Sequence, residues 1–176
     1  RDLHSFPTRR SSDLRLAANN DSRCKNLGTE SQDPDVIIVY MGTNDYDHNV
    51  ELGTYDGHDT IPSTVATFSD AYAVTLDKIL TTYKHAEVWC CTLQPMERHG
   101  QTGFPEKNNL GLTPEDYNEV IRKIAHAMNC KILEHSQCGI TYYNMPEYFE
   151  DWSGSKEHPN KAGHTLIARH DIRFML

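Results

Sequence analysis

The stretch Pro34-Asp-Val-Ile-Ile-Val-Tyr-Met-Gly-Thr-Asn-Asp45 decides the fold class. Residues 35–41 form a short, continuous apolar run rich in β-branched side chains, which predicts a strand covered on both faces, as in a parallel sheet. The Gly42-Thr-Asn-Asp45 segment that follows is a good turn, because Gly tolerates any backbone angle and Asn and Asp bond their own backbone. Taken alone, this segment predicts only a strand-to-loop connection.

Strands and helices alternate along the rest of the chain. Val88-Trp-Cys-Cys-Thr-Leu93 predicts a second buried strand, and residues 131–134 predict a shorter third one. Residues 63–83 are expected to form a helix, because apolar side chains recur there at helical spacing. These are Val65, Phe68, Tyr72, Leu76, Ile79 and Tyr83.

Two further helices are expected. The first starts at Thr113, which can cap free amide groups, and has Pro114 at its first position. Its inner face consists of Tyr117, Ile121, Ile124 and Met128. The last helix runs from about Asn160 to the C-terminus, with inward positions at Ala162, Ile167 and Ile172. The alternation predicts βαβ units and a three-layer α/β fold. Such sheets bind ligands at the carboxyl ends of their strands, where long loops follow at residues 42–62 and 94–112.

Composition excludes several classes of protein. The 176 residues include 17 Lys and Arg against 25 Asp and Glu, which gives a formal net charge of −8. Without a basic stripe, nucleic acid and anionic membranes are poor partners. The longest apolar run, residues 36–41, is far shorter than the roughly 20 residues of a membrane span. The five cysteines show neither a C-x-x-C pair nor zinc-like spacing with histidine, so no metal site is expected.

The first fourteen residues differ in kind from the rest. Arg1-Asp-Leu-His-Ser-Phe-Pro-Thr-Arg-Arg-Ser-Ser-Asp-Leu14 resembles the conceptual translation of a sequencing adapter read in frame into a coding sequence. An ordinary basic N-terminal tail is the alternative. We therefore interpret residues 1–14 as a non-natural segment and residues 15–176 as one domain whose natural N-terminus is missing. On this interpretation, the absence of a signal peptide leaves localisation open.

A second motif lies near the C-terminus, in His158-Pro-Asn-Lys-Ala-Gly-His164. Alone, it could be a helix start capped by Asn160. Together with residues 34–45, in this order, it resembles two sequence blocks of the SGNH hydrolases, also called GDSL-type esterases and lipases. The resemblance extends from about residue 22 to the end. It implies a flavodoxin-like parallel sheet between helices, here lacking its first one or two strands, and hydrolysis of carboxylic esters through an acyl-enzyme without a cofactor.

The resemblance also implies roles for individual residues. Asn44 would donate its side-chain amide to the oxyanion. Gly42 and Asp45 would be substrate-binding residues, since Gly42 leaves room for backbone approach and Asp45 braces the turn. His158 would be the general base, since an imidazole accepts and returns a proton near neutral pH. The substrate would be a small-molecule or carbohydrate-borne ester.

Two departures from the family pattern bear on activity. The acid that normally lies three residues before the histidine is replaced by Ser155, so Asp151, Ser155 or a backbone carbonyl remain as groups that could orient His158. The nucleophilic serine belongs to a G-D-S motif two βα units upstream, and residues 15–34 are too few for even one unit.

Two serines near the start resemble that motif only superficially. Ser22 follows Asp21 but has no apolar strand before it, and Ser12 belongs to the segment of residues 1–14. The nucleophile is therefore expected to be absent from this chain, which would then be inactive by itself. The alternative is a non-catalytic α/β domain that binds a ligand or a carbohydrate and uses residues 42–45 only as a turn. The residues do not determine the oligomeric state.

Overall fold

The computed structural model describes residues 14, 18–28, 32–97, 104–150 and 157–175. In this part, three parallel strands form one sheet in the order β1-β2-β3: Val36–Val39, Glu87–Cys91 and Lys131–Leu133. Val36 pairs with Glu87, and Trp89 pairs with Lys131. The predicted parallel α/β architecture is therefore confirmed, with few strands for a sheet of this class.

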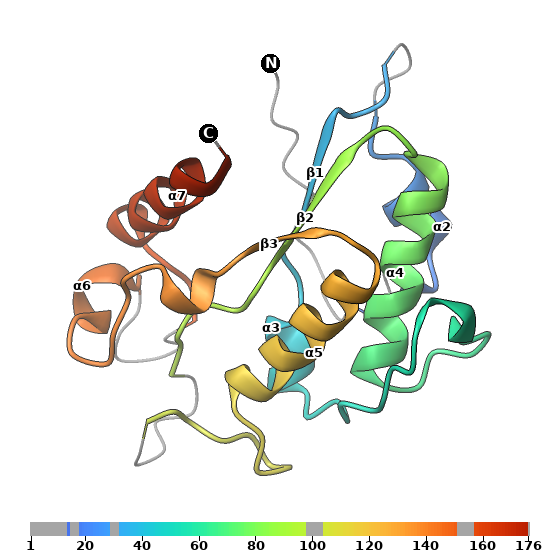
Figure 1. Ribbon diagram of the computed structural model, residues 1–176. Coiled ribbons are helices and arrows are strands. Elements are labelled where there is room, and N and C mark those ends of the chain that lie inside the picture. The colour runs from blue at the N-terminus through green and yellow to red at the C-terminus, as the bar shows by residue number, and fades with distance from the viewer. Residues whose placement is uncertain (1–13, 15–17, 29–31, 98–103, 151–156, 176) are drawn as a thin grey trace.

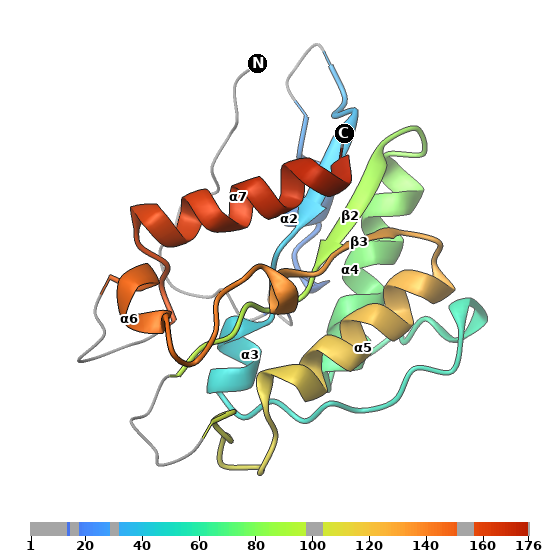
Figure 2. The same ribbon diagram turned by 60° about the vertical axis from the view of Figure 1, so that its left-hand side comes forward.

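Helices lie on both faces of this sheet (Figures 1 and 2). One face carries α2 (Asp21–Lys25), α4 (Phe68–Thr82) and α5 (Pro114–Ala127), and the other carries α7 (Lys161–Met175). The shorter elements are α3 (Thr43–Asp47), α6 (Met145–Tyr148) and the 3-10 turns η1 (His58–Thr60) and η2 (His135–Gln137). None of the helices in the described part of the chain is both long enough and apolar enough to cross a bilayer.

The main core lies between the sheet and α4 and α5. Ile37 and Val39 of β1 and Cys90 of β2 point into it and are at most 7% exposed. The spaced apolar residues predicted for the two helices meet them there, from Phe68 to Ile79 on α4 and from Tyr117 to Ile124 on α5. This burial is the main source of stability, since each fully buried large apolar side chain contributes roughly 1.5–3 kcal/mol.

The helix expected over residues 63–83 is shorter than predicted. It begins at Phe68 because Thr67 caps it: the Thr67 side chain accepts from the Asp70 N–H, and the Asp70 carboxylate accepts from the Thr67 N–H. Val65 lies before this cap and only packs against the core from outside the helix. The start predicted for the second helix is confirmed, with Pro114 in the first turn after Thr113.

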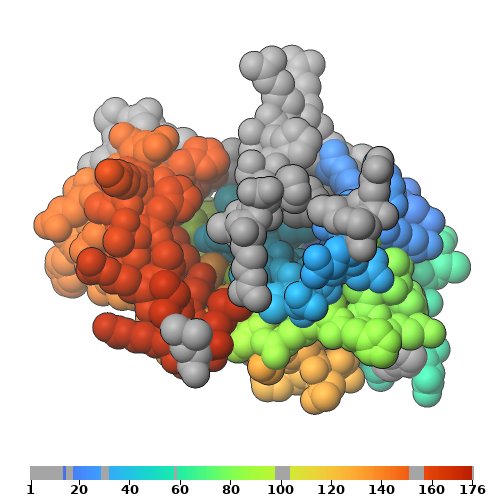
Figure 3. Space-filling view, turned by 90° about the horizontal axis from the view of Figure 1, so that it is seen from above, coloured from blue at the N-terminus to red at the C-terminus, as the bar shows by residue number. Residues whose placement is uncertain are grey.

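The prediction that residues 35–41 are covered on both faces is wrong. Burial alternates along β1, so that Val36 is 45% exposed and Ile38 is 47% exposed. The reason is the place of α7, whose Met175 packs against Trp89, Cys91 and Leu133 of the other two strands. Seen from above, α7 (red) lies to one side of β1 (blue) (Figure 3).

The inward positions predicted for the last helix are also partly wrong. Ile167 is buried as expected, but Ile172 is 55% exposed and Ala162 faces solvent. Gly163 replaces Ala162 as an inward position, because a Cβ at Gly163 would lie 2.4 Å from the Tyr148 carbonyl oxygen. The close contact between α6 and α7 thus sets the rotation of α7.

The alternation along β1 predicts opposite effects for the same substitution at neighbouring positions. Ile38→Lys should reduce aggregation, because it adds a charge to an exposed apolar edge strand, and should change the free energy of unfolding by less than about 1 kcal/mol. Ile37→Lys, the matched control, should lower it by more than about 4 kcal/mol, because the charge enters the core. Light scattering and urea denaturation measure the two effects, and equal behaviour of the two variants would contradict this description of β1.

Candidate functional site

The strand β1 ends in a segment whose backbone requires glycine. Gly42 has a φ of +126°, and a Cβ there would lie 3.2 Å from the Phe68 ring and 3.4 Å from the Leu93 side chain. Residues 43–47 then form the short helix α3 instead of the simple turn that the sequence predicts. The Gly42 carbonyl accepts from the Tyr46 N–H at 3.0 Å, which makes this helix begin directly at the carboxyl edge of the sheet.

Asn44 and Asp45 point to different surroundings. Asn44 is partly exposed, and its side-chain amide forms no hydrogen bond with another residue in the described part of the chain. Asp45 is fully buried, and its carboxylate accepts from the Leu14 N–H at 3.1 and 3.3 Å. The partly exposed amide of Asn44 and the buried carboxylate of Asp45 thus face different surroundings, and the roles expected for these two residues stay predictions.

His158 lies in the loop before α7. Its side chain is 73% exposed, and its Nε2 lies 3.2 Å from Oε1 of Glu157, whose side chain is 6% exposed. Asp151 and Ser155, the two side chains expected to be able to orient His158, both lie outside the described residues. Among the described residues, the carboxylate next to the imidazole is that of Glu157, the preceding residue in the chain.

One buried amide links the two motifs. Gln94, 2% exposed, follows β2; its Nε2 donates to the Glu157 carbonyl at 3.0 Å, and its Oε1 accepts from the Tyr40 hydroxyl. Tyr40 directly follows β1 and lies four positions before Asn44. Gln94 therefore joins the ends of β1 and β2 to the His158 loop. No local sequence signal predicts this connection, because both partners of Gln94 lie more than fifty positions away.

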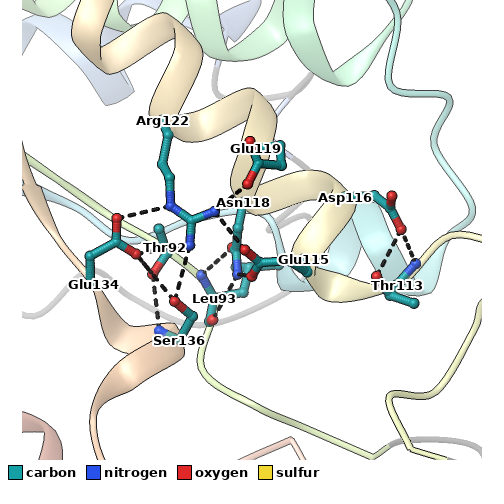
Figure 4. Close-up of polar contacts among 10 residues, drawn as sticks. All are labelled: Thr92, Leu93, Thr113, Glu115, Asp116, Asn118, Glu119, Arg122, Glu134 and Ser136. Carbon is teal, nitrogen blue, oxygen red and sulfur yellow. Dashed lines mark hydrogen bonds and ion pairs between the residues drawn. The ribbon is translucent and has the colours of Figure 1, made fainter.

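A polar network on α5 fixes the ends of β2 and β3 (Figure 4). Asn118 accepts from the Leu93 N–H at 2.7 Å and donates to the Leu93 carbonyl at 3.2 Å. Arg122 donates to both carboxylate oxygens of Glu134 at 2.9 Å, and Glu134 is also bonded to Ser136. Burial raises the pKa of Glu134, but the guanidinium of Arg122 outweighs this effect and holds the pKa below its ordinary value.

A second contact holds α7 against the sheet. His135, which follows β3, is 2% exposed, and its Nε2 lies 2.9 Å from the Asp171 carboxylate on α7. His170 reaches the same carboxylate at 3.4 Å, and Tyr40 packs edge-on against the His135 ring. Burial lowers the pKa of His135, while Asp171 opposes this shift.

Two hollows lie along α7, with volumes of about 640 and 530 Å³. Lys161, Thr165 and Arg169 line both of them, and neither is lined by Asn44 or His158. The candidate catalytic residues therefore lie at the carboxyl edge of the sheet and not in these hollows.

A parallel α/β sheet with polar side chains gathered at its carboxyl edge defines a class of ligand-binding and catalytic domains. The chain belongs to the family of GDSL-like lipases and acylhydrolases, whose sequence profile matches residues 3–170. This match includes residues 3–14, and Leu14 is buried in the core. The interpretation of residues 1–14 as non-natural stays a prediction.

Solved structures share this fold. A protein from Lactobacillus plantarum has a TM-score of 0.68 and 26% identity, over 81% of this chain and 67% of its own. A Clostridium thermocellum family 3 carbohydrate esterase has a TM-score of 0.57 and 17% identity, over 91% and 63%. An acetyl xylan esterase has a TM-score of 0.55 and 21% identity, over 93% and 75%. No curated protein sequence matches the chain.

The double hydrogen bond of Asn118 predicts a large loss of stability when it is removed. Asn118→Leu should lower the free energy of unfolding by about 2–4 kcal/mol, because the N–H and the carbonyl of Leu93 would be left buried without partners. Glu119→Ala, the control on the same helix, removes an ion-pair partner that is 72% exposed and should cost less than about 0.5 kcal/mol. Urea denaturation measures both; similar losses would mean that Asn118 does not fix the end of β2.

The buried His135 predicts a loss of stability in mild acid. Its pKa lies below the ordinary value of 6.5 in the folded state, so its contribution is present above pH 6.5 and is lost as the pH falls through the lowered pKa. The groups that face it are Tyr40, Glu134, His170 and Asp171.

The measurement is the free energy of unfolding between pH ~7 and ~5. His135→Gln should flatten its slope, whereas His85→Gln, at an exposed position, should not. An unchanged slope in His135→Gln would show that other groups cause any acid sensitivity.

Proposed function

We propose that the chain is the base-bearing and oxyanion-bearing part of a serine ester hydrolase. The observation that carries the proposal is the link from Tyr40 through Gln94 to Glu157, which ties the segment of Asn44 to that of His158 at one edge of the sheet. Acyl transfer requires two kinds of group around the same ester carbonyl. One is a hydrogen-bond donor for the developing oxyanion, and the other is a base for the nucleophile.

The proposed reaction uses a serine from a G-D-S segment that this chain does not contain. The serine hydroxyl attacks the ester carbonyl carbon, His158 takes its proton, and the Asn44 amide donates to the oxyanion. His158 then returns the proton to the leaving alkoxide, and water releases the acyl group from the serine by the same two steps. Gly42 lies two positions before Asn44, at the edge where the substrate would bind, and the buried Asp45 carboxylate accepts from the Leu14 N–H behind that edge.

The acid that steadies the imidazolium is proposed to be Glu157. Its carboxylate is already in contact with the ring at 3.2 Å, whereas Asp151 has only its position in the sequence in its favour. An acid in this role lowers the cost of the positive charge that forms on His158.

The proposed substrates are small acyl esters, including those carried on sugars. The names of two similar structures, a family 3 carbohydrate esterase and an acetyl xylan esterase, support this class. The net charge of −8 also favours neutral esters over anionic ones.

The experiment compares the 176-residue chain with an extended chain, in which the upstream coding sequence of the natural gene, where we propose the G-D-S motif to lie, replaces residues 1–14. The chain alone should neither hydrolyse p-nitrophenyl acetate nor react with a fluorophosphonate serine probe, and the extended chain should do both. In the extended chain, Asn44→Ala should lower kcat about 10²–10³-fold and His158→Gln about 10⁴-fold. His164→Gln, an exposed histidine on α7, is the control and should change neither.

Labelling of the 176-residue chain that disappears in Ser12→Ala or Ser22→Ala would contradict the proposal that the nucleophile lies outside it. An extended chain that binds the probe but keeps its activity in His158→Gln would contradict the role of the base.

A further inference from the structure

Two separate apolar clusters carry the two halves of the candidate site. Asn44 follows β1, whose Ile37 and Val39 belong to the main core with α4 and α5. His158 lies in the C-terminal part of the chain, residues 138–150 and 157–175, which we call the second unit. The small core of this second unit consists of Cys138, Ile140, Met145, Phe149 and Ile167. Contacts within one cluster therefore do not determine the position of His158 relative to Asn44.

The hydrogen bonds of the His158 loop mostly stay inside this second unit. The His158 carbonyl accepts from the Glu150 N–H at 3.0 Å, and Phe149 pairs with Pro159 in an isolated bridge. Asn160 donates its N–H to the Tyr148 carbonyl at 2.8 Å. These bonds fix the shape of the loop against α6, but they do not connect it to the sheet.

Gln94 supplies that connection. Its Nε2 donates to the Glu157 carbonyl at 3.0 Å, and the Glu157 side chain in turn contacts Nε2 of His158 at 3.2 Å. Its Oε1 accepts from the Tyr40 hydroxyl, at the end of the strand that leads into Asn44. Gln94 is 2% exposed, and both its Nε2 and its Oε1 have a partner, as a buried amide requires, whereas Tyr40 is 41% exposed.

The chemistry of the residue suits a link between two units. Apolar packing is non-directional, whereas a hydrogen bond fixes both a distance and an angle. An amide offers a donor and an acceptor a few ångströms apart and carries no charge, so the link is independent of pH. A carboxylate at this position would place a negative charge against the Glu157 carbonyl.

We propose that Gln94 is a positioning residue, which sets the place of His158 relative to Asn44 by joining Glu157 to Tyr40. This proposal rests on the proposed function for the roles of the two ends, but the link can be tested without any turnover. Changes in the surroundings of an imidazole and of an amide can each be followed, because both side chains have their own resonances in nuclear magnetic resonance spectra.

The experiment uses the 176-residue chain labelled with ¹³C and ¹⁵N. The imidazole signals of His158 are identified by their loss in His158→Gln, and the side-chain amide signals of Asn44 by their loss in Asn44→Ala. Gln94→Met removes both hydrogen bonds at nearly constant length, and Tyr40→Phe removes one hydroxyl. Tyr83→Phe is the matched control, because its hydroxyl accepts from the Leu27 N–H at 2.7 Å, next to α2.

In both Gln94→Met and Tyr40→Phe, the signals of His158 and Asn44 should shift, although Gln94 touches neither side chain. In Tyr83→Phe they should stay at their wild-type positions. Thermal unfolding of each variant separates this effect from a general loss of stability, which would lower the midpoint without moving the two sets of signals.

Two outcomes would overturn the proposal. The first is a folded Gln94→Met or Tyr40→Phe protein whose His158 and Asn44 signals coincide with those of the wild type. The second is unfolding of both variants, which would make the link a requirement of the fold as a whole. Failure of the proposed function is distinguishable, since it would appear as missing ester hydrolysis in the extended chain while the shifts caused by Gln94→Met persist.

Discussion

The hydrogen bonds between the Asn118 amide and the peptide groups of Leu93 determine where the central strand stops. The strand β2 ends at Cys91, and beyond it the chain is still buried, with Leu93 only 1% exposed. Buried peptide groups require partners, and none of the three strands in the described part of the chain supplies them for Leu93. One side chain of α5 satisfies both groups, and the direction of the next residue, Gln94, follows from the way Leu93 is held.

The neighbouring strand is held at its end in the same way by a charged pair. Arg122 binds Glu134 through two nitrogens, and Glu134 contacts Ser136, whose N–H donates to Thr92 Oγ1 (Figure 4). Paired charges of this kind add little net stability, because desolvation offsets much of the attraction. Their effect is geometric, because they fix the end of β2 relative to the end of β3. The candidate site lies at this edge of the sheet.

The regular part of the fold could be predicted from the sequence because its signals are local. The apolar spacing of α4 and α5 and the Thr113-Pro114 start each depend on residues within a few turns of one another. The exposed side of β1 could not be predicted, because an apolar run does not show which strands a helix covers. The same limit applies to α7, where Gly163 faces inward only because the Tyr148 backbone approaches it.

In the candidate site, too, the residues in local motifs could be predicted from the sequence, and those defined by long-range contacts could not. Asn44 and His158 were recognisable because they belong to contiguous motifs, and Gly42 because it follows a strand. Gln94 and Tyr40 were not, since a glutamine in a loop and a tyrosine after a strand are common residues and their contact spans 54 positions. Glu157 adjoins His158, but adjacency alone does not predict that a buried carboxylate turns toward the ring.

The two faces of the sheet differ in how precisely they are held. On the side of α4 and α5, a large core of interlocking side chains leaves little freedom, because interiors pack as densely as organic crystals. On the side of α7, a small cluster around Met175 is supplemented by the His135–Asp171 contact. Chemistry at an ester needs its groups aligned to within about an ångström. The proposed base, His158, lies on the loosely covered side and therefore depends on directional polar contacts with the sheet. The proposed oxyanion donor, Asn44, depends on them less, since it lies on α3, which follows β1 closely.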